Sequence, residues 1–488
     1  MSALSRRQAS AQLSRLRLGG FGRLGRLRRV GRVGRFGLLT LLALLALVLL
    51  TAALLASQRS QILAAAEAYL YGYPLVITDV TRAHAALTVG PPNQLRRVRQ
   101  FPDAHFKGVV RPNVDTLYTT AFIDMDQGPW VFEMAANAQR YEVMAFMDAW
   151  THVFAAPGTR VSGTGGERFL LAGPRWQGAL PPGLRLLRSP TRIVWLIGRT
   201  QTNGPADYPL VHRLQDGVTL RRLNGAATAE SEPEPDHARQ ASAAAAPPPL
   251  QQMQAMSTEA FFTRLAALLV DNPPAAADAP LLAKLADLGI APGQPLRWGR
   301  LQRWCFSLGR WAADFKVGRE LKQPRRLVRG WSTPPMNLGA YGTDYATRAV
   351  VAMIGLGANL PADAMYPNAQ VDAEGKTLQG SHRYRLHFKA GELPPVNAFW
   401  SVTAYGGDDY LIDNPLQRYA LGDRDPLTRN ADGSLDLWIQ AEAPPADKLS
   451  NWLPVRAGKP FLLNARLYWP RPEALTGAWG MPAVERVE

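Results

Sequence analysis

The chain has 488 residues, of which 47% are hydrophobic, and this composition is typical of a globular protein rather than a disordered or fibrous one. It carries 55 Lys and Arg against 39 Asp and Glu, but ten of the arginines fall within residues 1–36, where no acidic residue occurs. The remaining chain is only mildly basic, which argues against a nucleic-acid-binding body. The single cysteine, Cys305, excludes an intramolecular disulfide and a multi-cysteine metal site.

The N-terminal segments predict the compartment. Residues 1–36 form a basic tail with repeated glycine-arginine pairs, and glycine at every third position predicts no stable helix. Residues 37–57 are uncharged and rich in Leu and Ala, which is long enough for a transmembrane helix. The upstream arginines predict a cytoplasmic N-terminus, hence a single-pass inner-membrane protein with its bulk in the periplasm and the lipid bilayer as partner of residues 37–57.

One alternative to this membrane anchor and one alternative role for the basic tail remain open. A cleaved signal peptide is one, although the apolar run is longer than the core of about 7–15 residues found in such peptides. Nucleic-acid binding through the arginine tail is the other, and it predicts binding that weakens steeply with salt. We expect the anchor and no nucleic-acid partner.

The first half of the body, residues 58–224, is predicted to hold N-terminal helices and a first β domain. Residues 60–72 are typical of a helix, which Gly72 and Pro74 interrupt, and Pro74 can open a second helix through Ala86. Short strands separated by Gly and Pro follow, which favours a β-sandwich or closed barrel. The predicted strands are Tyr118–Asp124, Trp130–Glu133, Tyr141–Phe154, Arg168–Ala172 and Arg192–Gly198.

The second half is predicted to comprise an Ala/Pro-rich linker at 225–257, a helical connector at 258–330 and a second β domain at 331–488. Helical spacing predicts three helices, Thr258–Val270, Leu281–Leu288 and Arg300–Leu321. Alternating apolar residues predict four strands, Tyr384–Phe388, Ala398–Tyr405, Leu435–Gln440 and Phe461–Tyr468.

Two groups of motifs carry a family resemblance. Arg111-Pro112-Asn113-Val114-Asp115-Thr116-Leu117-Tyr118 resembles the signature of domain-of-unknown-function family 1254. Phe399-Trp400-Ser401-Val402-Thr403 and Arg466-Leu467-Tyr468-Trp469-Pro470 resemble family 1214. The resemblance spans roughly residues 60–488. It implies a mainly β (α+β) fold with two jelly-roll-like β-sandwich domains and connecting helices, commonly in exported proteins. It implies no reaction.

The first candidate site lies in the predicted strand Tyr141–Phe154. Asp148, Trp150 and His152 alternate along it and therefore share one face. At about 3.3 Å per residue, Asp148 and His152 would lie about 13 Å apart, too far for a hydrogen bond, yet both can line one pocket floored by Trp150. We predict them as acid/base candidates; the plainer interpretation is a solvated strand face.

The second candidate site is the group Arg111, Asn113, Asp115 and Tyr118. Asn and Asp two residues apart before a strand can bind their own backbone, and an Arg–Asp pair can fix a loop. The functional alternative makes Arg111 an anchor for a carboxylate, phosphate or sugar hydroxyl, with Asp115 as a general acid or base.

The third set is Tyr341, Asp344, Tyr345 and Arg348, which share one face if the segment is helical. An Asp–Arg pair on a helix is usually a surface salt bridge. The neighbouring aromatic residues make carbohydrate stacking the alternative function.

We predict no metal site and no cofactor. His382 and His387 would point to opposite faces of one strand, and Cys305 lies among apolar residues, where an inert thiol is expected. The sequence therefore favours a protein that binds an envelope component, carbohydrate or amphiphile. The alternative is a hydrolase of an envelope polymer or small exported substrate, using Asp148, His152 and Asp115.

Overall fold

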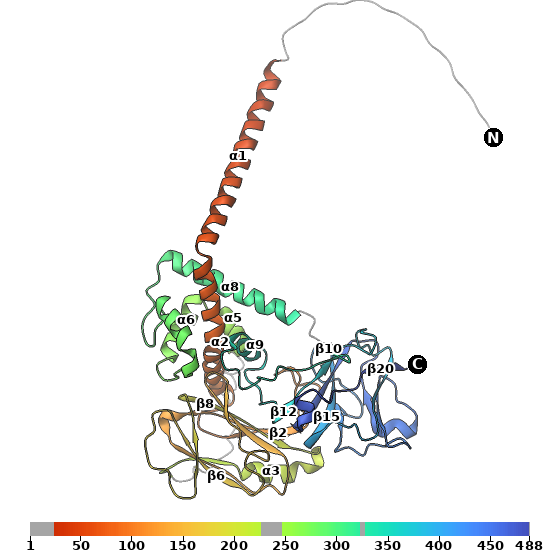
Figure 1. The fold of residues 1–488 in the computed structure, drawn as a ribbon. Helices are drawn as coiled ribbons and strands as arrows, with labels where there is room; N and C mark the ends of the chain where they lie inside the picture. Colours follow the sequence, from red (N-terminus) through yellow and green to blue (C-terminus); the bar gives the residue numbers. More distant parts are fainter. Residues whose placement is uncertain (1–23, 226–245, 323–326, 488) are drawn as a thin grey trace, which may run out of the picture. The chain divides into compact units, whose positions relative to one another are not determined.

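The computed structural model describes residues 24–225, 246–322 and 327–487 (Figure 1). Most of the predicted basic tail and of the predicted linker lies outside the described residues. The chain divides into two units, residues 1–61 and residues 62–488. Helices make up 32% of the residues and strands 25%, in several sheets, so the mixed α+β class is confirmed. Within residues 62–488, which form one compact unit, the domain boundaries stay predictions.

Helix α1 (Leu24–Ser57) begins within the glycine-arginine triplets and continues through the apolar segment. The expectation that these glycines prevent a helix is therefore wrong. Each glycine disfavours a helix by about 1 kcal/mol, but extending an existing helix requires no new nucleation, so the leucine-rich segment carries the helix back through the triplets. Residues Leu39–Ser57 have a mean hydropathy of 2.8 and are exposed. Among the described residues, this is the one helix long and apolar enough to cross a membrane.

Helix α2 (Arg59–Thr88) is continuous through Pro74, so the prediction of two helices is wrong. A proline inside a helix costs about 3 kcal/mol. Packing offsets this cost, because residues 68–80 are buried on every side of the helix. Gly72 permits the close packing, since a Cβ there would lie 2.5 Å from Leu265 Cδ2.

The other helices of this region lie beside α2 (Figure 1). They contribute apolar side chains to one core with it. They are α5 (Pro249–Ala255), α6 (Thr258–Leu268), α7 (Ala279–Asp287), α8 (Arg300–Lys322) and α9 (Tyr345–Gly355). The three predicted helices are confirmed as α6, α7 and α8. Helix α6 begins where expected because Ser257 caps it, its hydroxyl oxygen accepting the backbone N–H of Ala260 at 3.1 Å.

The first sandwich consists of two sheets. The five-stranded sheet has the order β1 (Arg96–Arg97), β2 (Thr116–Asp124), β8 (Ile193–Gln201), β4 (Glu142–Asp148) and β5 (Val153–Ala155). The four-stranded sheet has the order β7 (Arg185–Arg188), β6 (Glu167–Ala172), β3 (Trp130–Met134) and β9 (Thr219–Arg222), and α3 (Tyr208–Asp216) precedes β9. Their inner faces share one core, in which the rings of Phe132 and Phe146 lie 5.0 Å apart.

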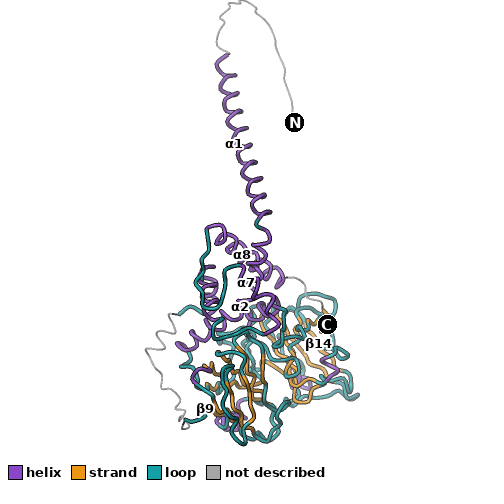
Figure 2. Tube along the Cα trace, turned by 60° about the vertical axis from the view of Figure 1, so that its left-hand side comes forward, coloured by secondary structure: helices purple, strands orange, loops and turns teal. Residues whose placement is uncertain are grey.

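The second sandwich also consists of two sheets (strands are orange in Figure 2). The first has the order β10 (Leu327–Val328), β11 (Trp331–Ser332), β13 (Asn368–Ala369), β19 (Phe461–Pro470), β15 (Val396–Gly406) and β16 (Ala420–Gly422), with β12 (Ala364–Met365) also on β19. The second has the order β18 (Trp452–Pro454), β17 (Leu435–Gln440), β14 (Arg383–Phe388) and β20 (Val484–Val487), and α10 (Pro472–Leu475) follows β19.

The outer face of β15 and β19 packs on the first sandwich. Phe399 and Tyr468 from these strands form a buried cluster with Tyr141, which precedes β4, and with Val143, which lies in β4. The pairing of Ser401 with Arg466 places two polar side chains on the same outer face. The junction between the sandwiches is therefore part apolar and part polar.

Most predicted strands are confirmed with shifted ends, and β17 has the predicted bounds. The strand predicted over Tyr141–Phe154 is wrong, because the chain forms a hairpin of β4 and β5 there. The jelly-roll-like connectivity stays a prediction.

Candidate functional site

The first predicted site lies in the turn between β4 and β5. The Asp148 side chain accepts backbone N–H groups of Trp150 and His152, both at 2.9 Å. The Asp148 N–H also donates to the His152 carbonyl at 2.9 Å, and Thr151 has a φ of +68°. An aspartate that bonds its own backbone two residues on favours a turn over a strand. Asp148 and His152, expected about 13 Å apart, are therefore in direct contact.

Two residues of the third predicted set, Tyr341 and Arg348, contact this turn. Helix α9 begins after Asp344, whose carboxylate caps it by accepting the Thr347 N–H at 3.1 Å. One turn further, the Arg348 guanidinium donates to His152 Nε2 at 3.0 Å. Because a guanidinium can only donate, Nε2 is the acceptor and the neutral His152 ring carries its proton on Nδ1.

Three aromatic rings surround the Arg348 guanidinium. Its central carbon lies 5.3 Å from the ring centroid of Tyr71 and 5.2 Å from those of Trp150 and Tyr345. Both tyrosine hydroxyls donate to Asp278, at 3.3 Å from Tyr71 and 2.8 Å from Tyr345. We name these residues the Arg348 cluster: Tyr71, Asp148, Trp150, His152, Asp278, Tyr345 and Arg348.

The centre of the Arg348 cluster is buried, while His152 and Tyr345 are half-buried, and not every polar atom has a hydrogen-bond partner. Arg348 is 1% exposed, and its Nε and Nη2 atoms have no hydrogen-bond partner. Burial lowers the pKa of its guanidinium. Cation–π contacts at a desolvated site are worth about 2 kcal/mol, so the three rings stabilise the buried guanidinium charge. The Tyr341 ring lies 5.6 Å from His152, and its buried hydroxyl also has no partner.

The titratable groups of the cluster are shifted in opposite directions. Burial raises the pKa of Asp148 to about 7, against the effect of its two backbone donors. Burial and the nearby Arg348 charge lower the pKa of His152 to about 4. One proton-accepting atom of each side chain is engaged within the protein: Asp148 Oδ1 accepts two backbone N–H groups, and His152 Nε2 accepts from Arg348. These hydrogen bonds close the turn between β4 and β5 and join it to α9.

The second predicted set lies at the junction of the sandwiches. Asp115 is fully buried; its Oδ2 accepts the Ser401 hydroxyl at 2.7 Å, and its Oδ1 pairs with Arg424. Arg466 Nε lies 4.0 Å from the same carboxylate. Asn113 Oδ1 accepts the N–H of Asp115 at 2.7 Å, which fixes the loop before β2.

Asn113 and Arg111 also bind across the junction, whereas Tyr118 contacts its own sheet. Asn113 Nδ2 donates to the Tyr468 hydroxyl at 2.8 Å, and Arg111 Nε pairs with Asp409 at 2.7 Å. Tyr118 lies beneath the Arg199 guanidinium, 5.1 Å from it. We name the polar junction the domain seam: Arg111, Asn113, Asp115, Ser401, Asp409, Arg424, Arg466 and Tyr468. Sequence reasoning missed most of the partners, although Ser401, Arg466 and Tyr468 fall in the family motifs.

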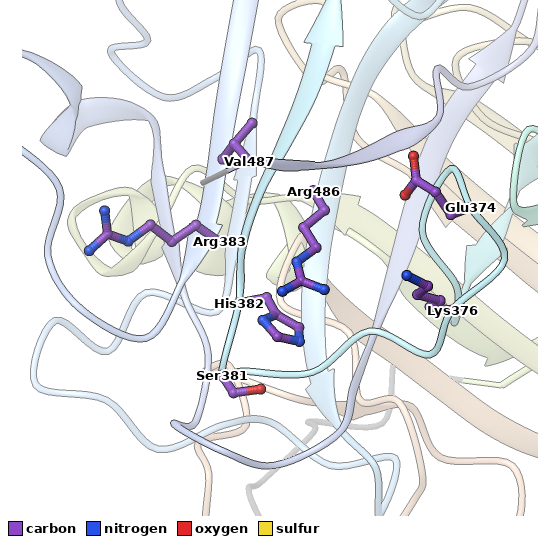
Figure 3. Close-up of a pocket in the computed structure, with 7 residues that line it drawn as sticks. All are labelled: Glu374, Lys376, Ser381, His382, Arg383, Arg486 and Val487. Carbon is purple, nitrogen blue, oxygen red and sulfur yellow. The ribbon is translucent and has the colours of Figure 1, made fainter.

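A further site was not predicted. A pocket of about 500 Å³ opens at the end of β14 and β20 (Figure 3). We name it the basic pocket; its lining residues are Glu374, Lys376, Ser381, His382, Arg383, Arg486 and Val487. The nearness of Lys376, His382 and Arg383 in the sequence could have indicated a basic site, but His382 was considered only as a possible metal ligand. Within the described ranges, no group of three or more His, Cys, Asp or Glu side chains can hold a metal ion.

The fold and these sites define a two-sandwich α+β protein, with a helical core and a buried polar seam. Residues 92–222 match the family "protein of unknown function" DUF1254, and residues 363–472 match the family of the same description DUF1214. The resemblance seen in the motifs is therefore confirmed, because the chain pairs these two families in the expected order.

Two solved structures are similar. The VPA0106 protein from Vibrio parahaemolyticus is 24% identical with a TM-score of 0.66, covering 88% of this chain and 100% of its own, so the two share the fold. An uncharacterised protein from Burkholderia cenocepacia is 12% identical with a TM-score of 0.42, covering 90% of this chain and 95% of its own. None of the curated proteins matches significantly.

Proposed function

We propose that the chain is a single-pass inner-membrane protein whose body lies in the periplasm and binds an envelope component. The support for the anchor is the exposed apolar surface of Leu39–Ser57, preceded by ten arginines and no acidic residue. Basic residues next to an apolar helix stay on the cytoplasmic side, so the chain after the helix is exported. A phosphatase reporter fused to the C-terminus, active only in the periplasm, is expected to be active; an inactive reporter contradicts this topology.

One observation favours binding over hydrolysis: both candidate carboxylates are buried and already accept hydrogen bonds from the protein itself. Asp148 accepts two backbone N–H groups, and the fully buried Asp115 pairs with Arg424 and Ser401. A general acid or base must come within hydrogen-bond reach of a substrate. Sandwich domains, jelly-roll-like ones included, host many binding functions without catalysis.

One observation favours the hydrolase instead. The pKa of Asp148 is raised to about 7, which suits a general acid or base at neutral pH. Using it would require the turn between β4 and β5 to open, since Asp148 is only 6% exposed. The hydrolase is therefore the second candidate.

The two functions are separated by one experiment on the full-length chain in a maltoside detergent. Peptidoglycan fragments, envelope glycans and envelope lipids are added, and both bound ligand and released product are measured. We expect saturable binding without product. Product that Asp148→Asn abolishes would establish the hydrolase, and neither binding nor product from any component would contradict both functions.

A further inference from the structure

One side of the basic pocket is a hydrogen-bonded turn at residues 372–376. Asp372, 2% exposed, accepts the backbone N–H groups of Glu374 at 3.1 Å and Lys376 at 2.8 Å through one carboxylate oxygen. Its own N–H donates to the Lys376 carbonyl at 2.8 Å, and Gly375 supplies the φ of +78° that closes the turn. The turn therefore holds Lys376 at the rim of the pocket.

The other side of the pocket is formed by the end of β20 and by the loop that precedes β14. Strands β14 and β20 pair Tyr384 with Arg486. Arg486 therefore lies near the end of the sheet, next to the buried Tyr384. The His382 N–H donates to the Gln379 carbonyl at 3.1 Å, which fixes the loop that carries Ser381. In Figure 3 the side chains of Lys376, His382 and Arg486 gather at the pocket, while Arg383 points away from them.

Two cations of the pocket, Lys376 and Arg486, are not paired with any described carboxylate. Among the described residues, no carboxylate lies within 4.0 Å of Lys376 or Arg486, and Glu374 is the single acidic residue of the lining. Two other arginines of β14 differ: Arg385 pairs with Glu485 at 2.6 Å, and Arg383, whose side chain points away from the other cations of the pocket (Figure 3), lies 3.6 Å from Glu442. The pocket therefore carries positive charge that no described carboxylate within 4.0 Å neutralises, which favours an anionic ligand.

We propose that the basic pocket binds a phosphate group, carried by a lipid headgroup or by a soluble phosphorylated sugar or polyol. This inference rests on the proposed binding function and names its site. Lys376 from the turn, Ser381 and His382 from the loop and Arg486 from β20 approach from different directions, which suits the tetrahedral oxygens of phosphate better than a planar carboxylate. A pocket of about 500 Å³ is within the size range of small-ligand sites.

The test uses the full-length chain in maltoside micelles, which contain no phosphate. Inorganic phosphate and glycerol 1-phosphate are titrated into the wild type and into the double variant Lys376→Gln/Arg486→Gln. We expect saturable binding by the wild type and a dissociation constant about tenfold or more higher in the double variant, because charge-assisted hydrogen bonds are lost. The matched control Lys389→Gln removes one exposed cation outside the pocket and is expected to bind within about twofold of the wild type.

Competition then identifies the source of the phosphate. Displacement of glycerol 1-phosphate by micelles containing phosphatidylglycerol, at a lower concentration than by free glucose 1-phosphate, supports a lipid headgroup; the reverse order supports a soluble ligand. Glucuronate binding as tightly as glucose 1-phosphate would overturn the assignment to phosphate, as would equal phosphate affinity in the double variant. An envelope component bound equally by both proteins would refute this site while leaving the proposed function intact.

Discussion

The domain seam and the basic pocket use the same residue types in opposite ways. In the seam, the buried Asp115 pairs with Arg424 and Ser401, and Asn113 reaches Tyr468. In the basic pocket, Lys376 and Arg486 are exposed and face no described carboxylate within 4.0 Å. A charge in the interior is costly unless an opposite charge, hydrogen bonds or aromatic rings compensate it, whereas a solvated charge needs no such partner. The comparison teaches that the charged residues of the second candidate site are bound to other parts of the protein, whereas Lys376 and Arg486 of the basic pocket have no such partner among the described residues.

The largest effect is expected from breaking the seam. Asp115→Ala leaves Arg424 and the buried Arg466 without their carboxylate, so we expect the free energy of unfolding to fall by about 3–5 kcal/mol. Urea unfolding followed by tryptophan fluorescence measures it. Asp409→Asn is the matched control, because its ion pair with Arg111 is about one-third exposed and is expected to contribute less than about 1 kcal/mol. Equal stability of the two variants would show that the seam is not a buried ion pair.

A smaller effect is expected in the Arg348 cluster. Arg348→Met removes three cation–π contacts and the hydrogen bond to His152, but two guanidinium nitrogens already lack partners. We therefore expect a loss of about 2 kcal/mol in the same urea experiment. Arg348→Lys, which keeps a cation without the planar group, is expected to fall between wild type and Arg348→Met. A loss larger than that of Asp115→Ala would reverse the order proposed for the two clusters.

The same cluster predicts two opposing pH effects. The pKa of Asp148 is raised to about 7 in the fold, so the folded chain binds more protons and this group's contribution to stability falls as pH rises from about 4 to 7. The pKa of His152 is lowered to about 4, so its contribution rises between about pH 4 and 6.5. Each slope is at most about 1.4 kcal/mol per pH unit.

Two substitutions separate these slopes. Asp148→Asn removes the falling contribution, so the variant is expected to gain stability relative to wild type as pH rises through this window. His152→Gln removes the rising contribution and is expected to lose stability relative to wild type as pH rises from about 4 to 6.5. Unfolding free energies measured at half-unit pH intervals test both. Differences that do not change with pH would mean that neither group is buried as described.

The smallest effect is expected at the basic pocket. Lys376→Gln and Arg486→Gln remove exposed, unpaired cations, so each is expected to change the free energy of unfolding by less than about 0.5 kcal/mol. The Lys389→Gln control should behave alike. A loss above about 1 kcal/mol in either pocket variant would mean that its cation stabilises the fold, in conflict with the comparison.

Local signals predicted the elements that local interactions determine. Ser257 caps α6 at the expected start, and the alternation in Leu435–Gln440 gives β17 its predicted bounds. The turn at Asp148 was missed because an apolar run continues through it, while its cause is a side-chain bond to the Trp150 and His152 backbone. The continuity of α2 through Pro74 depends on burial by other helices, which no local pattern records.

The candidate sites divide in the same way. The predicted ability of Asn113 to bind its own backbone is confirmed, because that contact is local. The meeting of Trp150 and His152 with Arg348, and of Asp115 with Arg424, joins residues about 200 and 309 positions apart, which one sequence cannot pair. The functional roles predicted for these residues stay predictions.

The most direct measurement of the central claim compares glycerol 1-phosphate binding by the full-length wild type, Asp148→Asn and Lys376→Gln/Arg486→Gln. If the ligand binds at Lys376 and Arg486, Asp148→Asn retains the wild-type dissociation constant within about twofold. The double variant raises it about tenfold or more. Full affinity in the double variant together with lost binding in Asp148→Asn would contradict the account, because it would place the ligand in the interior.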